Sequence, residues 1–237
     1  MYLILDTAAD EFSAAATSTA GFASGVSSLV VTDGEKISDR YDYLGEDLTR
    51  MAMDSLGFAR VPGARLFGAI DYKAARLLTH SDFSIDQALF VDSKAEKNAY
   101  SNCRIQITQT SMTVRQVRQQ EHINKPGLID KIWVTPTNRF LSTTVFVKYH
   151  YKTDPIPELS QVTIVCLPHG FLQQRYNPSV YDTIFSVGPD SPKLKEKFRT
   201  RIHFESLENK APWRVQRMWP GEPWKFNDEI DKKKRPR

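Results

Sequence analysis

The chain has 237 residues, of which 41% are hydrophobic and 25% are charged, and a net charge of +4. This length suffices for one well-cored domain, and we expect a single domain over residues 1–237. The mild basic charge fits a polyanionic partner and equally fits an ordinary solvated surface. Two cysteines, Cys103 and Cys166, exclude a disulfide framework and a zinc cluster, so we expect an intracellular, cytoplasmic protein.

Residues 1–38 are expected to form an N-terminal helical segment, with a helix rich in small residues over residues 9–30. Asp6, Asp10 and Glu11 precede the stretch rich in Ala, Ser and Thr over residues 12–31 and no positively charged region does, which argues against a signal peptide. No apolar run reaches the roughly 18 residues that a membrane-spanning helix needs, so we expect no membrane partner.

A second helix is predicted over residues 39–58, where apolar side chains recur at helical spacing and Glu46 and Asp47 fall early. The apolar residues that form this face are Leu44, Leu48, Met51, Met53 and Leu56.

Two short apolar runs then carry charged residues at their ends. The run Leu66–Ile70 is followed by Asp71, and the run Gln87–Val91 is followed by Asp92 and Lys94. In a strand, Asp92 and Lys94 project from the same face, about 6–7 Å apart. If Asp71 lies on a neighbouring strand, two carboxylates and one ammonium converge. Carboxylates hold a divalent cation such as Mg²⁺, and a nearby lysine orients or activates a water.

An Asp-x-Lys triplet alone is weak evidence, because it also occurs on solvated strand faces. Here the triplet ends an apolar run that is typical of a buried strand. Burying these charges is costly unless they serve each other or a metal ion. The pattern therefore favours a metal-dependent site.

Residues 95–125 are polar and rich in glutamine and arginine, with Arg104, Arg115 and Arg118 among them. Such side chains suit contact with a phosphate backbone, although a solvated helix or a long loop explains the composition equally well. Strands are predicted over residues 142–151, 162–167 and 201–204.

Three tryptophans and three prolines between residues 212 and 224 predict an irregular aromatic C-terminal segment. Residues 219–237 form an irregular basic tail that can add nonspecific attraction to phosphate.

Five blocks of this sequence resemble the SfiI-type restriction endonucleases, a branch of the PD-(D/E)xK superfamily related in architecture to BglI. They appear in the family's order, from about residue 40 to residue 217, and are Phe67–Lys73, Leu89–Asn98, Leu167–Pro178, Arg199–Phe204 and Pro212–Arg214. The resemblance implies an α/β fold with a central mixed β-sheet flanked by helices.

By this resemblance Asp71 and Asp92 ligate Mg²⁺, a site that Mn²⁺ or Ca²⁺ can also occupy, and Lys94 positions or activates the attacking water. Glu46 occupies a helical position from which many relatives offer a further acid. Its neighbour Asp47 is the alternative, and plain stabilisation of the first helical turn explains Glu46 equally well.

Two histidines are candidate general bases, but we expect His169 to be structural and His80 to be a loop residue.

Arginines are expected to read the DNA sequence. Arg199 and Arg201 alternate along a strand, so both face one side and can donate two hydrogen bonds to guanine. Pairing with phosphates, or with Glu196 and Glu205, is the alternative. The remaining expected DNA contacts are Lys73, Lys97, Asn98, Asn102 and Arg104.

The resemblance implies a type II restriction endonuclease that cuts both strands of an interrupted, G·C-rich palindrome and leaves 5′-phosphate ends. Two-strand cutting requires at least a homodimer, and a homotetramer is consistent with the family. A cognate DNA methyltransferase is expected in the same system. The rival hypotheses are a structure-directed or nonspecific PD-(D/E)xK nuclease, a non-catalytic DNA-binding module and a structural α/β protein.

Overall fold

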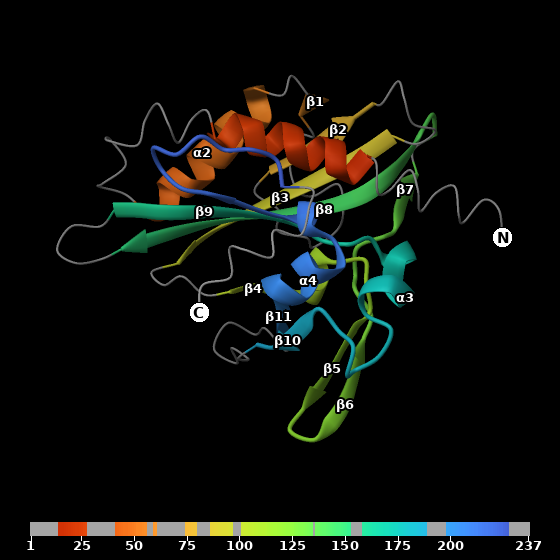
Figure 1. Ribbon diagram of the computed structural model, residues 1–237. Helices are drawn as coiled ribbons and strands as arrows, with labels where there is room; N and C mark the ends of the chain where they lie inside the picture. Colours follow the sequence, from red (N-terminus) through yellow and green to blue (C-terminus); the bar gives the residue numbers. More distant parts are fainter. Residues whose placement is uncertain are drawn as a thin grey trace.

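A mixed β-sheet forms the centre of the molecule (Figure 1). The computed structural model describes residues 14–27, 41–55, 59–60, 74–79, 86–96, 101–134, 136–152, 158–188 and 198–227. Within these residues the sheet has seven strands, which are, in spatial order, β1 (Ala59–Arg60), β2 (Ala74–Leu78), β3 (Asp86–Glu96), β8 (Arg139–Lys152), β9 (Glu158–Cys166) and β12 (Val215–Met218), with β7 (Ile132–Val134) paired to β8.

Strand β8 is the core of this sheet, and its sequence explains why. Twelve consecutive residues of β8, from Phe140 to Tyr151, are buried, which is typical of a central strand covered on both faces. β8 runs parallel to β3 and antiparallel to β9. The expected α/β fold with a central mixed sheet is therefore confirmed.

Two helices cover one face of the sheet: the helix over residues 14–27 (red in Figure 1) and α2 (Tyr41–Ser55, orange). From α2, Leu48, Ala52 and Met53 are buried in the main core. Each large apolar side chain buried in this way contributes about 1.5–3 kcal/mol. Gly45 allows close approach, because a Cβ atom there would lie 2.9 Å from the ring of Tyr149.

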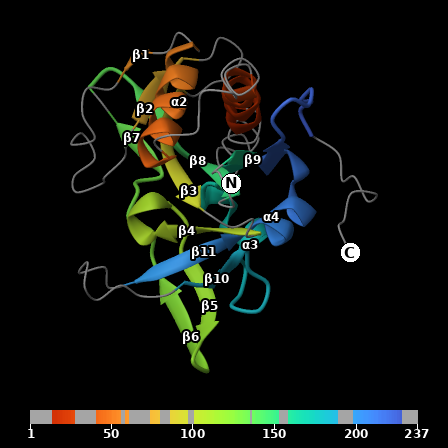
Figure 2. The same cartoon turned by 90° about the vertical axis from the view of Figure 1, so that its left-hand side faces the viewer.

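The opposite side of the central sheet carries a second, three-stranded sheet, which we call the recognition sheet because its arginines are expected from the sequence to read DNA. Both views place it below β3 and β8, with the β5–β6 hairpin beyond it (Figures 1 and 2). The strands of the recognition sheet are, in spatial order, β10 (Phe185–Val187), β11 (Arg199–His203) and β4 (Asn102–Gln106). The strands of the separate hairpin are β5 (Val114–Arg118) and β6 (Glu121–Lys125).

Short helical segments connect the two layers. They are η3 (Ile107–Gln109), η4 (Gly170–Leu172), α3 (Gln173–Tyr176), α4 (Phe204–Lys210) and η6 (Pro212–Arg214). Among the described residues, no helix is long and apolar enough to cross a membrane.

The predicted helices over residues 9–30 and 39–58 are confirmed within residues 14–27 and 41–55. The strands predicted over residues 142–151, 162–167 and 201–204 are confirmed by β8, β9 and β11, although position 204 begins α4 instead of ending the strand. The strand predicted before Asp71 lies outside the described residues, and the nearest described strand, β2, begins at Ala74.

Both interpretations of the secondary structure of residues 95–125 were wrong, because the described part of this segment forms strands. The β5–β6 hairpin turns through Gln119 and Gln120, whose φ angles are 49° and 67°. Two consecutive residues with positive φ are typical of a two-residue hairpin turn, which usually contains Asn-Gly or Asp-Gly. Gln-Gln gives no such signal, so the sequence did not indicate the hairpin.

The C-terminal segment is irregular over residues 219–227, as expected, but the strand β12 before it was not predicted. Gln216 fixes the start of the tail: its side chain donates to the carbonyl of Asn227 (2.9 Å) and accepts from the amide of Asn227 (2.8 Å).

Arg214 is the largest fully buried side chain among the described residues. Its guanidinium lies 4.2 Å from the ring centre of Trp213 and 4.9 Å from that of Tyr176. It donates to the Tyr176 hydroxyl (3.0 Å) and to the Leu167 carbonyl (3.3 Å). Two of the sequence blocks, Leu167–Pro178 and Pro212–Arg214, thus meet in one buried cluster.

We predict that Arg214→Ala lowers the free energy of unfolding by about 3–5 kcal/mol. The substitution leaves a cavity, and it removes the hydrogen-bond donor of the Tyr176 hydroxyl and the Leu167 carbonyl. Urea denaturation measures this loss. Arg217→Ala, three residues further along the chain in β12, is the matched control: it breaks a partly exposed pair with Glu208 and should cost at most about 1 kcal/mol. Equal losses in the two variants would contradict the structural role of Arg214.

Candidate functional site

Asp92 and Lys94 lie on β3 at the face of the central sheet that turns away from α2. The Lys94 Nζ atom lies 2.5 Å from Asp92 Oδ2. The Asp92 side chain is only 3% exposed, whereas that of Lys94 is 30% exposed. The expected pairing of these two side chains on one strand face is therefore present, with the carboxylate buried and the lysine partly exposed.

A third residue, Gln109, completes the surroundings of the carboxylate. Its Nε2 atom donates to Asp92 Oδ2 at 2.8 Å, and the residue is buried. Both contacts of Asp92 use Oδ2, and within the described residues Oδ1 accepts no hydrogen bond. Sequence reasoning missed Gln109, because a glutamine 17 positions from Asp92 in a segment of uncertain structure carries no motif.

The neighbouring strand β8 places two side chains beside Asp92 and Lys94. Phe146 and Lys148 are in register with Asp92 and Lys94, respectively. Lys94 lies 6.0 Å from the centre of the Phe146 ring. Lys148 is fully buried and donates to the main-chain carbonyl of Asn102 at 2.8 Å, which joins the central sheet to the recognition sheet.

Several predicted site residues lie outside the described part of the chain, namely Asp71, Lys73, Lys97 and Asn98, as do His80 and Glu196. Glu46 is in α2, but only its backbone is described. Asp47 is exposed and pairs with Arg50 on α2. Among the described residues no group of three or more His, Cys, Asp or Glu side chains could hold a metal ion.

The recognition sheet presents a polar face built from β11 and β4. Burial alternates along β11: Thr200 and Ile202 are buried, whereas Arg199 and Arg201 are partly exposed. Arg201 is in register with the exposed Arg104 of β4, so their side chains share a face. The register partners of Arg199 and His203 on this face are Gln106 and Asn102.

Arg201 keeps most of its hydrogen-bonding capacity. Its Nη1 atom donates to Asn102 Oδ1 at 3.3 Å, and its buried Nε atom has no partner within the described residues. No carboxylate is among the register partners of these arginines on β4. The polar face therefore presents the side chains of Arg199, Arg201, Arg104 and Asn102 together.

Arg115 and Arg118, which composition made candidates for phosphate contact, have acceptors within the chain. Arg115 donates to the carbonyls of Asn177 and Pro178, and Arg118 donates to that of Gly188.

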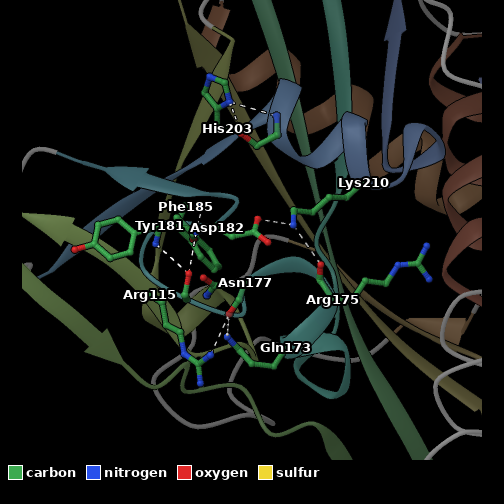
Figure 3. A network of polar contacts seen from close by, with 12 residues as sticks. Arg115, Gln173, Arg175, Asn177, Tyr181, Asp182, Phe185, His203 and Lys210 are labelled. Atoms are coloured by element: carbon green, nitrogen blue, oxygen red, sulfur yellow. Dashed lines mark hydrogen bonds and ion pairs between the residues drawn. The ribbon is translucent and has the colours of Figure 1, made fainter.

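Figure 3 shows the polar network that includes Arg115. In the same network Lys210 lies 2.6 Å from Asp182, which fastens α4 to the loop before β10. These contacts hold the recognition sheet and its hairpin in place.

His169 is structural, as expected. It is buried, its Nε2 atom lies 2.7 Å from the Lys131 carbonyl, and its Nδ1 atom accepts from the Phe171 amide. Burial lowers the pKa of His169 to about 4, and the charges of Lys131 and Arg214 favour the neutral form further. A neutral imidazole that donates through Nε2 and accepts through Nδ1 satisfies both contacts.

Comparison with solved structures defines the class of protein. The restriction endonuclease BglI bound to its DNA recognition sequence gives a TM-score of 0.73 at 14% identity, covering 93% of this chain and 94% of that chain. The tetrameric restriction endonuclease SfiI bound to cognate DNA gives a TM-score of 0.71 at 24% identity, covering 87% of this chain and 83% of that chain. The fold is therefore that of a restriction endonuclease.

Sequence comparison defines the family. The family model for the type II restriction enzyme SfiI matches residues 12–218. The type II restriction enzyme SfiI of Streptomyces fimbriatus is 30% identical over 203 residues, covering 81% of this chain and 75% of that protein. This chain belongs to the SfiI family of type II restriction enzymes, which are site-specific deoxyribonucleases.

We predict that the protein loses stability as the pH falls from 7.5 to 5, because the unfolded chain binds a proton at His169 below pH 6.5 and the folded protein does so only below about pH 4. This group alone should cost about 2 kcal/mol at pH 5. Urea denaturation at both pH values measures the loss. In His169→Gln, the difference between the two pH values should shrink by that amount, and an unchanged difference would show that His169 titrates normally.

Proposed function

We propose that this protein makes Mg²⁺-dependent double-strand cuts at an interrupted, G·C-rich palindrome in DNA and leaves 5′-phosphate ends. The observation that carries the proposal is the buried Asp92 carboxylate beside the Lys94 ammonium on β3, next to a sheet with an arginine-rich face. Restriction endonucleases of this type generally use a divalent metal ion.

The donor chemistry around Asp92 fits Mg²⁺. Lys94 and Gln109 both contact Oδ2, so Oδ1 keeps its lone pairs for a cation, and an oxygen ligand is what Mg²⁺ prefers. In the proposal Asp71 is the second carboxylate ligand, whereas Glu46 lies on α2, which packs on Tyr149 at the opposite face of the sheet, and is not part of the ligand set. When bound, Mg²⁺ supplies positive charge that offsets the negative charge developing on the scissile phosphate.

Lys94 has the position of a group that acts on the attacking water. Its ammonium lies 6.0 Å from the centre of the Phe146 ring, pairs with Asp92, and belongs to a side chain that is 30% exposed. From there it can orient a water molecule for in-line attack on phosphorus. In-line attack with departure of the 3′ oxygen leaves a 5′-phosphate and a 3′-hydroxyl end.

The recognition sheet is proposed to read guanines. A guanidinium with two donors on one edge matches the O6 and N7 acceptors of guanine in the major groove, and Arg201 has unused donors there. Arg199 extends the same face, and Asn102 and Arg104 lie across from the β11 arginines and histidine. Lys73, Lys97 and Asn98 are proposed to contact the DNA near the cut.

Two active sites related by a twofold axis are needed to cut both strands of a palindrome, so the proposed assembly is a homodimer or a homotetramer. The solved SfiI relative is tetrameric and bound to cognate DNA, which supports this proposal. A restriction role also requires a cognate methyltransferase to protect the host DNA.

We predict that the wild-type protein and Mg²⁺ cut a fully sequenced phage-sized DNA into discrete fragments, whose sequenced ends share one interrupted palindrome. Asp92→Asn should abolish cutting, because it removes the negative charge while keeping the shape of the side chain. Lys94→Met should slow cutting about 10²–10⁴-fold. Random ends would indicate a nonspecific or structure-directed nuclease. Metal-independent binding without any cutting would indicate a DNA-binding module and overturn the proposed function.

We predict that Arg201→Lys reduces discrimination between the cognate site and a site with one G·C pair replaced, by about 1–3 kcal/mol for the affected base pair. A lysine cannot donate the paired hydrogen bonds of a guanidinium. Ratios of kcat/KM for the two sites measure the change. Arg50→Lys on α2, which covers the opposite face of the central sheet, is the control and should leave the ratio unchanged. An unchanged ratio in Arg201→Lys would assign this side chain to phosphate contact.

A further inference from the structure

Gln109 lies between the proposed catalytic carboxylate and the recognition sheet and contacts both. Its Nε2 atom donates to Asp92 Oδ2 at 2.8 Å, and its Oε1 atom accepts from the main-chain amide of Gln106 at 3.0 Å. Because an amide nitrogen can only donate and an amide oxygen can only accept, these two partners fix the orientation of the side chain. Both ends of one buried amide are therefore in use.

The strand that Gln109 holds is part of the proposed base-reading surface. Gln106 ends β4 and is in register with Arg199 of β11, and Arg104, two residues earlier, is in register with Arg201. A shift of β4 when the arginines meet base edges would move the Gln106 amide. Through Gln109, that movement reaches the Asp92 carboxylate.

The other end of β4 is also joined to the central sheet. Lys148, in register with Lys94 on β8, donates to the Asn102 carbonyl at the start of β4. Asn102 in turn accepts from Arg201 at 3.3 Å. The recognition strand is thus fastened at both ends to residues beside Asp92 and Lys94.

The backbone that carries Gln109 is held rigidly. A Cβ atom on Gly127 would lie 2.2 Å from the Thr110 carbonyl oxygen, and one on Gly170 would lie 2.3 Å from that of Ser111. Such close approaches are possible only for glycine. Gln173 and Asn177 also bind the main chain of Thr113. With its segment clamped in this way, Gln109 has little freedom other than to follow its two partners.

We propose that Gln109 is a positioning residue that couples base reading by the recognition sheet to the catalytic carboxylate. It directs Oδ2 of Asp92 away from the cation, keeps Oδ1 available for it, and loses this geometry when incorrect DNA displaces β4. The inference rests on the proposed function of Asp92. Gln109 would therefore contribute to the discrimination between DNA sequences in the cutting step, and not in the DNA-binding step.

The test removes both hydrogen bonds with Gln109→Met, which preserves the length of the side chain. Single-turnover cutting of the cognate site is measured across Mg²⁺ concentrations, and DNA binding is measured separately in Ca²⁺. We expect an apparent Mg²⁺ affinity or cutting rate about 10- to 100-fold lower, as is usual when a partner of a metal ligand is lost. The dissociation constant for cognate DNA should change less than about threefold.

The coupling itself is tested by combining Gln109→Met with Arg201→Lys. If Gln109 relays base reading, Arg201→Lys should reduce cutting discrimination less in the Gln109→Met background than in the wild type, because neighbouring changes on one path are not additive. Additive effects of the two substitutions would overturn the coupling.

Gln216→Met is the matched control, because Gln216 is also buried and also uses both ends of its amide, but it lies in β12 and binds Trp213 and Asn227. It should affect stability and leave the Mg²⁺ dependence unchanged. Should Gln109→Met fail to fold, Gln109→Asn, with a reach shorter by one methylene, gives the same test.

The outcomes separate the two proposals. Wild-type Mg²⁺ dependence and discrimination in Gln109→Met, in a protein that cuts and whose Asp92→Asn variant does not, would overturn this inference alone. A wild-type protein that does not cut would overturn the proposed function and this inference with it.

Discussion

A buried carboxylate on the third strand of the central sheet is the constraint on which the rest of the arrangement depends. Removing a charge from water costs several kcal/mol unless charged or hydrogen-bonding partners replace the solvent, and Asp92 has Lys94 and Gln109 for that purpose. Both partners use the same oxygen. The architecture around β3 therefore stabilises the charge and leaves the other oxygen free of hydrogen bonds within the described residues.

In the proposed function the two sheets have separate roles. The central sheet, covered by α2 and the helix over residues 14–27, holds Asp92 and Lys94 beside the buried strand β8, while the recognition sheet presents arginines on a partly exposed face. Two polar links, through Lys148 and Gln109, join the layers. An enzyme that must cut only at its own sequence needs such links, because recognition and chemistry otherwise proceed independently.

The sequence predicted the elements whose signals are local. Apolar runs predicted β8 and β9, helical spacing predicted α2, and the Asp-x-Lys spacing predicted the pairing on β3. It did not predict the β5–β6 hairpin, because Gln119 and Gln120 adopt positive φ without a glycine or asparagine. It also missed Gln109, which meets Asp92 only after the chain folds back through β4 and η3. The resemblance blocks around His169 and Arg214 form a buried scaffold, which agrees with the structural role expected for His169.

The most direct test of the account is a crystal structure of the protein with its cognate DNA and Ca²⁺, which occupies such sites without supporting rapid cutting. The account predicts electron density for a cation within about 2.3–2.6 Å of Asp92 Oδ1, with Gln109 still bound to Oδ2 and Arg201 at a guanine edge. A cation bound elsewhere, with Asp92 Oδ1 remote from it and from the scissile phosphate, would contradict the central claim.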